Sequence, residues 1–206
     1  MIGHSWKKPE ERIGAFTLVE LLMVIALIAV LIGLITMSIT SIGRSQQLGL
    51  AGTTSVDLLN YARQLAKSEN TLTRVALISQ GAEAGRVMTV LQYRRETDEW
   101  KQVDRWITMP EGFEMDLAEL QEPPPNSVAL FTVADPQITL KRSGADVQAR
   151  VLEFLPSGRP HVSGNVPLVG TIRGTHSDGK NFYRIVVNPS TGIPVARRPE
   201  SSAAGN

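Results

Sequence analysis

The residues from Gly14 to Gly43 read GAFTLVELLMVIALIAVLIGLITMSITSIG, and they decide what kind of chain this is. The 23 residues between Glu20 and Arg44 include no charged side chain. As an α-helix this span would be about 35 Å long, and the hydrocarbon core of a bilayer is about 30 Å thick. The span is apolar on every face, unlike an ordinary surface helix. It therefore predicts a membrane-spanning helix.

Glu20 is the charged residue within this apolar run, between Leu18-Val19 and Leu21-Leu22. A carboxylate in hydrocarbon costs at least about 2.5 kcal/mol, so ionisable residues there are rare and have a partner. A plain membrane anchor has no use for such a residue. Glu20 is therefore the candidate functional group of the segment.

The run Phe16-Thr17-Leu18-Val19-Glu20-Leu21-Leu22 follows a short basic leader. It resembles the N-terminus of type IV prepilins and of the pseudopilins of type II secretion, over Gly14 to about Ile35. The resemblance implies that a membrane-embedded aspartic peptidase, the prepilin peptidase, removes the leader on the cytoplasmic side and N-methylates the new first residue. It also implies that the fifth mature residue, a glutamate, neutralises the α-ammonium group of a neighbouring subunit in a filament.

Placed on this chain, the resemblance makes Ala15 and Phe16 the residues that flank the cut. Phe16 would be the methylated residue, and Phe16 and Glu20 would form the assembly pair. Ala15 departs from the family's usual glycine before the cut. A cut between Gly14 and Ala15 restores the glycine but makes Glu20 the sixth mature residue. The aromatic start and the position of the glutamate favour the Ala15–Phe16 bond.

Electrostatics supports such a pairing independently of the resemblance. An amine and a carboxylate at the same depth in lipid each lower the desolvation cost of the other. A subunit that has both groups, offset along its helix, can pair with the next copy head to tail. Such heterologous contacts build helical filaments when they do not close into rings.

Three other interpretations of the apolar run compete. A secretory signal peptide has an apolar core of about 7–15 residues followed by a small-residue cleavage site, whereas this run is longer and Ile35-Thr36-Met37-Ser38-Ile39 is a poor site. An ordinary single-span anchor leaves Glu20 unexplained. A buried core helix is disfavoured by the length of the run.

The composition fits a small domain on a membrane anchor. The chain has 206 residues, and about 140 remain for one globular core after the leader and the apolar stem are set aside. There is no cysteine, which excludes disulfides and thiolate metal sites. The cations of the leader, Lys7, Lys8 and Arg12, favour a cytoplasmic N-terminus. The globular part is then expected outside the cytoplasm.

The charges balance once the leader is removed. Its three basic and two acidic residues, taken from totals of 21 and 20, leave 18 of each sign in the mature chain. A balanced chain argues against a generally basic nucleic-acid-binding surface.

The chain is predicted to have five segments. They are a leader (1–15), a transmembrane and polymerisation helix (16–43), an amphipathic stem helix (44–70), a β-rich head (71–199) and a disordered tail (200–206). In the stem, apolar residues recur at helical spacing, and Asn70 is expected to end the helix because asparagine tolerates the left-handed conformation.

Beyond the stem the pattern indicates β-strands, because β-branched and apolar residues alternate with turn residues. The predicted strands are Thr71–Ile78, Arg86–Tyr93, Glu99–Thr108, Ser127–Val133, Ala149–Leu155, Val169–Arg173, Asn181–Val187 and a short final strand. Asp135-Pro136 is expected to stop the fourth of these strands. Trp100 and Trp106 are expected to share one face of the third, since their separation is even.

One long helix followed by strands predicts an α+β class rather than alternating βαβ units. The resemblance makes this expectation more specific. It implies a pilin-like fold, in which a long N-terminal helix, transmembrane in its first half, packs on an antiparallel β-sheet head.

No catalytic or metal-binding motif occurs in the sequence. His4, His161 and His176 are far apart, and no metalloprotease, nucleophile-elbow or P-loop pattern is present. Asp178-Gly179-Lys180-Asn181 could offer oxygens to calcium, but one carboxylate is too few for an ion that takes 6–8 ligands, so a plain turn is expected. We therefore predict no catalytic residue, no metal, no cofactor and no enzyme activity.

Weaker motifs point to one branch of the family. Tyr61-Ala62-Arg63-Gln64-Leu65-Ala66, the turn within Leu152–Gly158, and Ile185-Val186-Val187 with Thr191-Gly192 are similar to segments of H-type minor pseudopilins. The overall layout also resembles protein D of the Verru-Chthon cassette, a pilin-like family of unsettled role. Each motif is weak alone, since many β proteins contain such turns.

The favoured role is therefore a minor pseudopilin of a type II secretion-like system. It would be a single-pass inner-membrane protein with a periplasmic head. Its expected partners are other pilin or pseudopilin subunits, the prepilin peptidase and the inner-membrane assembly platform, and no nucleic acid. Two alternatives stay open: a minor pilin of a surface type IV pilus, and a monomeric membrane-tethered domain that binds a ligand.

Overall fold

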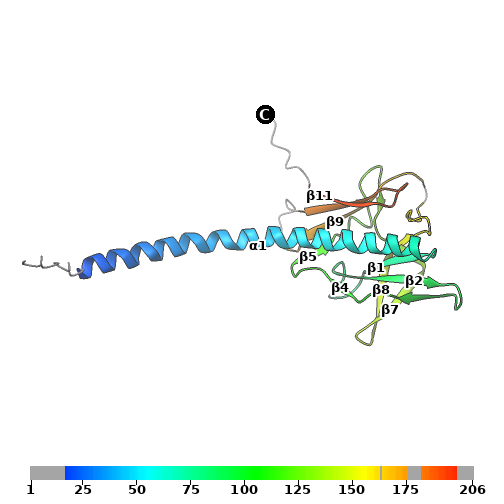
Figure 1. Cartoon of the computed structure of the whole chain (residues 1–206), viewed down its shortest axis with the longest axis horizontal. Helices are drawn as coiled ribbons and strands as arrows, with labels where there is room; N and C mark the ends of the chain where they lie inside the picture. The colour runs from blue at the N-terminus through cyan, green and yellow to red at the C-terminus, as the bar shows by residue number, and fades with distance from the viewer. Residues whose placement is uncertain (1–16, 163, 176–181, 199–206) are drawn as a thin grey trace, which may run out of the picture. The chain divides into compact units, whose positions relative to one another are not determined.

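The computed structural model describes residues 17–162, 164–175 and 182–198 (Figure 1). The chain divides into two compact units, Met1–Arg44 and Ser45–Asn206. A single helix, α1 (Leu18–Ser68), begins in the first unit and ends in the second, where strands β1 to β11 follow it. The predicted leader and the predicted C-terminal tail lie outside the described residues.

Helix α1 ends where the sequence indicates. Its last helical residue is Ser68, and Asn70 adopts the left-handed conformation with φ of 47°. The Thr71 amide donates to the carbonyl of Ala66 over 3.1 Å, which closes the last turn in the way glycine or asparagine caps do. The predicted stop at Asn70 is confirmed.

Within the described part of the chain, no helix combines the length and the apolar composition that a bilayer crossing requires. The transmembrane segment predicted over residues 16–43 stays a prediction.

Six strands form the first sheet, called sheet A, in the order β3-β2-β1-β8-β7, with β4 also pairing with β2. All of its strand pairs are antiparallel. The strands are β1 (Thr73–Ile78), β2 (Val87–Arg94), β3 (Glu99–Gln102), β4 (Ile107–Thr108), β7 (Thr132–Arg142) and β8 (Ala145–Phe154).

Five strands form the second sheet, called sheet B, in the order β11-β10-β9-β5. Its fifth strand, β6, pairs with β9 in parallel, and its other pairs are antiparallel. The strands are β5 (Phe113–Met115), β6 (Val128–Ala129), β9 (Leu168–Gly174), β10 (Phe182–Val187) and β11 (Pro194–Arg197).

The stem, the part of α1 from Ser45 onward, shares one hydrophobic core with both sheets (Figure 1). Thr73 at the start of β1 donates from its hydroxyl to the carbonyl of Ala62 over 2.8 Å, which ties the sheet to the helix. Helix and sheet residues of this core include Leu58, Leu59, Ala62, Val75, Val90, Leu152, Ile172, Ile185 and Val187.

Two strand predictions are wrong, and turn chemistry explains the first. The predicted strand Glu99–Thr108 is two strands, β3 and β4, with a bend between them. The Asp104 carboxylate accepts from the next backbone N–H, of Arg105, over 2.7 Å, and such local bonds compete with strand pairing. Trp106 falls in this bend rather than in a strand, so it does not share a strand face with Trp100.

The second error concerns the predicted strand Ser127–Val133, which the structure divides between β6 of sheet B and the start of β7 of sheet A. β7 does not stop at Asp135-Pro136 but continues to Arg142, with a register shift between Val133 and Ile138. β7 is an edge strand of sheet A, and proline, which donates no ladder bond, is tolerated on edges and at bulges. The head also contains two sheets rather than one. The α+β class itself is confirmed.

Candidate functional site

The start of α1 is built as a reciprocal cap between Thr17 and Glu20. The backbone N–H of Thr17 donates to Glu20 Oε2 over 3.2 Å, and the Thr17 hydroxyl donates to the same oxygen over 3.0 Å. In return, the backbone N–H of Glu20 donates to Thr17 Oγ1 over 3.2 Å. This is a capping box, in which two otherwise unpaired helix N–H groups are satisfied.

The cap gives Glu20 a structural use that the sequence interpretation missed. A carboxylate in the first turn is also stabilised by the helix dipole, typically by about 0.3–1 kcal/mol. The T-x-x-E spacing of Thr17 and Glu20 ahead of an apolar run is a recognised signal for a helix start, so the sequence contained the information. A plain anchor could therefore also use this glutamate, and the residue alone does not identify an assembly protein.

The helix surface around Glu20 is the stronger observation. Every residue from Thr17 to Leu31 is exposed. The exposed fractions of the large apolar side chains stay high on all sides of the helix, for example 77% at Leu18, 60% at Leu21, 63% at Leu27 and 63% at Val30. An apolar surface of this extent is stable only when lipid or other protein covers it.

The remaining predicted site residues are not described by the structure. Gly14, Ala15 and Phe16 lie outside the described residues, so neither the cut nor the position of a mature N-terminus relative to Glu20 is seen. The same holds for His4, His176 and the predicted turn from Asp178 to Asn181.

Two of the family-like motifs meet on the stem. Gly158 and Gly192 both adopt positive φ, of 79° and 70°, and a Cβ on Gly192 would lie 1.9 Å from the carbonyl oxygen of Gly158. Arg63 of α1 donates from Nε to the carbonyl of Thr191 over 2.9 Å. The two turns therefore close against each other and against α1, an arrangement that their separation in sequence does not reveal.

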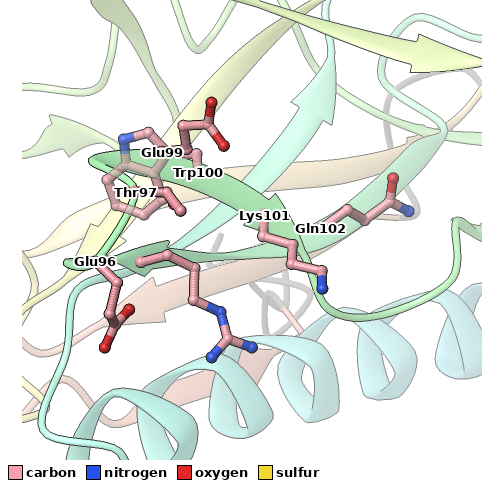
Figure 2. Close-up of a pocket in the computed structure, with 7 residues that line it drawn as sticks. Glu96, Thr97, Glu99, Trp100, Lys101 and Gln102 are labelled. Carbon is pink, nitrogen blue, oxygen red and sulfur yellow. The ribbon is translucent and has the colours of Figure 1, made fainter.

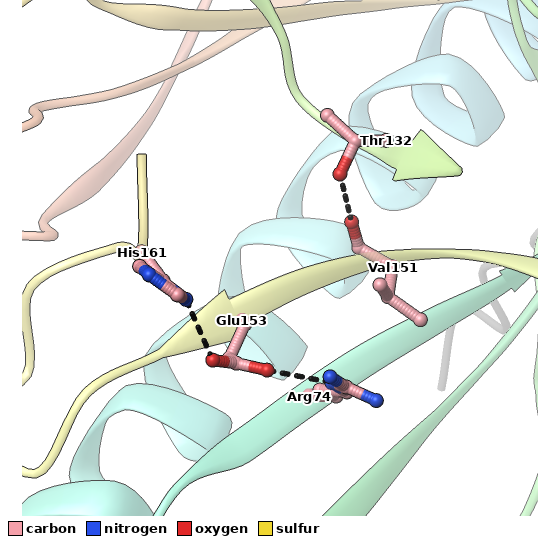
Figure 3. A network of polar contacts seen from close by, with 5 residues as sticks. All are labelled: Arg74, Thr132, Val151, Glu153 and His161. Carbon is pink, nitrogen blue, oxygen red and sulfur yellow. Dashed lines mark hydrogen bonds and ion pairs between the residues drawn. The ribbon is translucent and has the colours of Figure 1, made fainter. Parts of the chain in front are cut away.

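A polar network joins the inner strands β1 and β8 of sheet A to the loop that contains His161 (Figure 3). Glu153 of β8 accepts from Arg74 Nε over 2.7 Å, and its other oxygen lies 2.9 Å from His161 Nδ1. The guanidinium of Arg74 also lies 3.9 Å from the ring centroid of Trp100. Each member has a partner, so the network holds two strands and a loop together rather than presenting a reactive group.

The hairpin turn between β2 and β3 borders a shallow hollow of about 610 Å³. Figure 2 shows Trp100, Glu99 and Glu96 around it, together with Lys101 and Gln102 of β3. Next to it the Tyr93 hydroxyl donates to the Asp98 carboxylate, and this hydrogen bond raises the pKa of Tyr93. Both acidic and basic side chains line the hollow, and its lining residues include no nucleophile paired with a base.

Among the described residues, no group of three or more histidine or acidic side chains could hold a metal ion. His161 lies beside a single carboxylate, that of Glu153. The candidate site is thus the exposed apolar start of α1 with its capped glutamate.

No protein-family model matches this chain, and no curated protein matches it. Solved structures similar to it include two of the minor pseudopilin EpsH from the type II secretion system of Vibrio cholerae. They are 14% and 12% identical, with TM-scores of 0.48 and 0.46, and cover 75% and 76% of this chain and 99% of their own.

Another similar structure is the type IV minor pilin FimU of Pseudomonas aeruginosa. It is 11% identical, with a TM-score of 0.45, and the match covers 78% of this chain and 94% of that one. These neighbours belong to the two classes that the N-terminal run resembles, and none of the three is a Verru-Chthon protein. Since each TM-score is below 0.5, the function has to be inferred from the chain's own residues.

Proposed function

We propose that this chain is a pilin-like structural subunit that loses its leader and assembles through the N-terminal part of α1. In the finer form of the proposal, it is a minor pseudopilin in the periplasmic pseudopilus of a type II secretion-like system. It performs no catalysis itself. The observation that carries the proposal is the exposed apolar surface from Leu18 to Leu31, with one carboxylate, Glu20, at its start.

The exposed apolar surface of the helix suits both environments of a pilin-like subunit, the membrane and the filament. Lipid covers the helix before assembly, and neighbouring helices cover it afterwards, so one apolar face serves both states. In the unassembled chain Thr17 satisfies the Glu20 carboxylate. After the leader is removed, the α-ammonium group of Phe16 from a neighbouring subunit becomes the stronger partner, because it brings a full positive charge to the carboxylate, whereas Thr17 offers only the dipoles of its amide and hydroxyl.

The remaining parts of the proposal follow from the leader and the charge pattern. Three leader cations favour a cytoplasmic N-terminus, which gives a single-pass inner-membrane precursor with its head in the periplasm. The prepilin peptidase would cut the Ala15–Phe16 bond and methylate Phe16. The inner-membrane assembly platform would then receive the mature subunit.

Two substitutions separate the capping role of Glu20 from its role in assembly. Glu20→Gln keeps an acceptor for the Thr17 amide, since glutamine also serves in capping boxes, but it removes the negative charge. Thr17→Val removes the capping hydroxyl and keeps that charge. A photo-crosslinking residue at Val30, which is 63% exposed, reports the neighbours of the helix in cells that produce the full chain.

We expect Glu20→Gln to reduce crosslinks to other subunits at least tenfold while the chain stays in the membrane. We expect Thr17→Val to reduce them less than twofold. If Glu20→Gln crosslinks like the wild type, the charge has no role in assembly, and a monomeric tethered domain becomes the better description.

A further inference from the structure

The outer face of sheet B, the face turned away from α1, contains a pair of arginines in direct cross-strand register. Arg184 of β10 lies opposite Arg197 of β11, and on its other side it lies opposite Thr171 of β9. Like charges directly opposite each other in a sheet are destabilising. The chain therefore keeps an unfavourable charge pair at this position. A partner that neutralises the two arginines would offset their repulsion.

The acids of the head neutralise only part of this face. Arg173 of β9 forms an ion pair with Asp116 and lies opposite Glu114 of β5. Arg184 lies 3.7 Å from Glu119 Oε1, too far for a hydrogen bond. For Arg197, no ion pair is found among the described residues. The positive charge without an ion pair among the described residues is thus that of Arg197 on β11, next to the weakly paired Arg184 on β10.

Two buried polar atoms near this face make no hydrogen bond among the described residues. The hydroxyl of Thr171 is on a residue that is 6% exposed, and it makes no hydrogen bond in the described part of the structure. The same is true of Glu119 Oε1, whose side chain is 13% exposed. Buried polar groups destabilise the fold when they are left without a hydrogen bond.

Apolar side chains border the arginines. Val186 pairs with Val195, one row along from Arg184 and Arg197, and Val195 is 43% exposed. The basic residues of β9 to β11 are all arginine and none is lysine. Protein interfaces are enriched in arginine and depleted in lysine, and the planar guanidinium group is suited to two-pronged bonding of carboxylates.

This face lies at the end of the head where the stem enters. Tyr183 of β10 packs on Gly52 of α1, with its Cγ atom 3.2 Å from where a Cβ would be. The opposite end of the head is marked by Arg95, which donates to the carbonyl of Asn70 over 3.0 Å. Gly52 and Asn70 are roughly 27 Å apart along a helix.

We propose that Arg184, Arg197, Val186 and Val195, called here the arginine face, dock the head of a neighbouring protein subunit. The partner surface presents carboxylates between apolar side chains. This inference rests on the proposed function, because it describes the surface of the neighbour that the same subunit would contact in an assembly. A protein face fits better than a lipid headgroup layer, since the two valines form a cross-strand row beside the arginine row.

A photo-crosslinking residue at Val195 of the full chain, in cells that assemble it, tests the proposal. The matched control is the same residue at Val133, an exposed valine of sheet A that is 53% exposed. We expect a protein adduct from Val195 at least five times stronger than from Val133, attached to a partner peptide that contains aspartate or glutamate. Arg197→Glu should remove this adduct, and Lys at the partner's acidic position should restore it.

Other outcomes would overturn the proposal. They are equal adducts at both valines, an adduct at Val195 that Arg197→Glu leaves unchanged, or an adduct to lipid alone. Leader removal and the Val30 crosslinks should be normal in Arg197→Glu. Loss of those as well would point to failure of the proposed function rather than of the arginine face.

Thermal unfolding of the full chain in detergent separates docking from a structural role. Since Arg197→Gln relieves repulsion from Arg184, we expect its Tm to equal or exceed that of the wild type, while the adduct from Val195 falls at least fivefold. A clear decrease in Tm would show that Arg197 stabilises the head itself, and the proposal would be wrong.

Discussion

Glu20 has a structural role in the cap of α1, and the proposed role in assembly comes in addition to it. Its carboxylate closes the cap with Thr17 and stands at the head of an exposed apolar helix surface. The sequence identified the residue because a carboxylate is costly among apolar neighbours. The cap was not predicted, because the cost of a carboxylate among apolar side chains indicates a partner but does not say whether that partner lies on the same helix or on another molecule.

Among the described glycines of the head, Gly192 is the one at which an added Cβ would lie nearest to another atom. We expect Gly192→Ala to destabilise the protein by roughly 3–5 kcal/mol, a range reserved for severe local conflicts, because its Cβ would overlap the Gly158 carbonyl. Gly144→Ala is the matched control: its φ of 82° is also positive but no atom lies within 4 Å of the added Cβ. It should cost about 1–2 kcal/mol for the backbone conformation alone. Equal losses in chemical denaturation would show that the close approach of the two turns has no energetic weight.

The ion pair between Glu83 and Arg142 predicts that the head loses stability in acid. Its carboxylate accepts two bonds from Arg142, at 2.6 and 2.7 Å, and this hydrogen bonding holds the pKa of Glu83 below its ordinary value of about 4.5. A depressed pKa contributes stability that is present above the unfolded-state value and is lost as pH falls through the folded-state value. We expect Glu83→Gln to lower Tm at neutral pH and to flatten the decline of Tm below about pH 4.5.

Glu96→Gln is the control for that measurement, since Glu96 makes no ion pair in the described structure. Its Tm should follow the wild type across the acid range. A Glu83→Gln curve parallel to the wild type would mean that the ion pair with Arg142 does not contribute.

At the scale of elements, the sequence predicted those whose pattern is local. The stop of α1 at Asn70 and the strands β1 and β2 followed from residue type and spacing. The bend between β3 and β4 depended on the Asp104 side chain, which also fits a strand pattern. The course of β7 past Pro136 depended on its place at a sheet edge, which spacing does not reveal.

The division into two sheets was also beyond the sequence pattern, because it depends on pairings between distant segments. Strand β9 pairs with β5, β6 and β10, and β5 is only Phe113–Met115, too short to stand out. For the candidate site, the sequence was more informative than the structure. The apolar run was evident in the sequence, whereas Gly14, Ala15 and Phe16 lie outside the described structure.

The stem of α1 should be the energetic support of the head. Leu59 is 1% exposed within the shared core, whereas Leu50, on the same helix, is 58% exposed. We expect Leu59→Ala to cost about 2–5 kcal/mol and Leu50→Ala less than about 0.5 kcal/mol, measured by chemical denaturation of the full chain. Similar losses at both positions would contradict the packing of the stem on the sheets.

At the scale of the whole molecule, the chain exposes apolar and charged surface that its own described residues do not cover. The head buries its own core, but the first turns of α1 expose apolar side chains on every side. In the arginine face, Arg197 has no ion pair among the described residues. Both features fit the proposal that the chain functions among neighbouring subunits.

Intact-mass analysis of the protein extracted from membranes tests the central claim most directly. We expect the mass of the chain from Phe16 onward with one added methyl group, since a processed pilin-like subunit loses Met1 to Ala15 and is methylated at its new start. A chain that still begins with Met1, isolated from cells with an active prepilin peptidase, would contradict the claim.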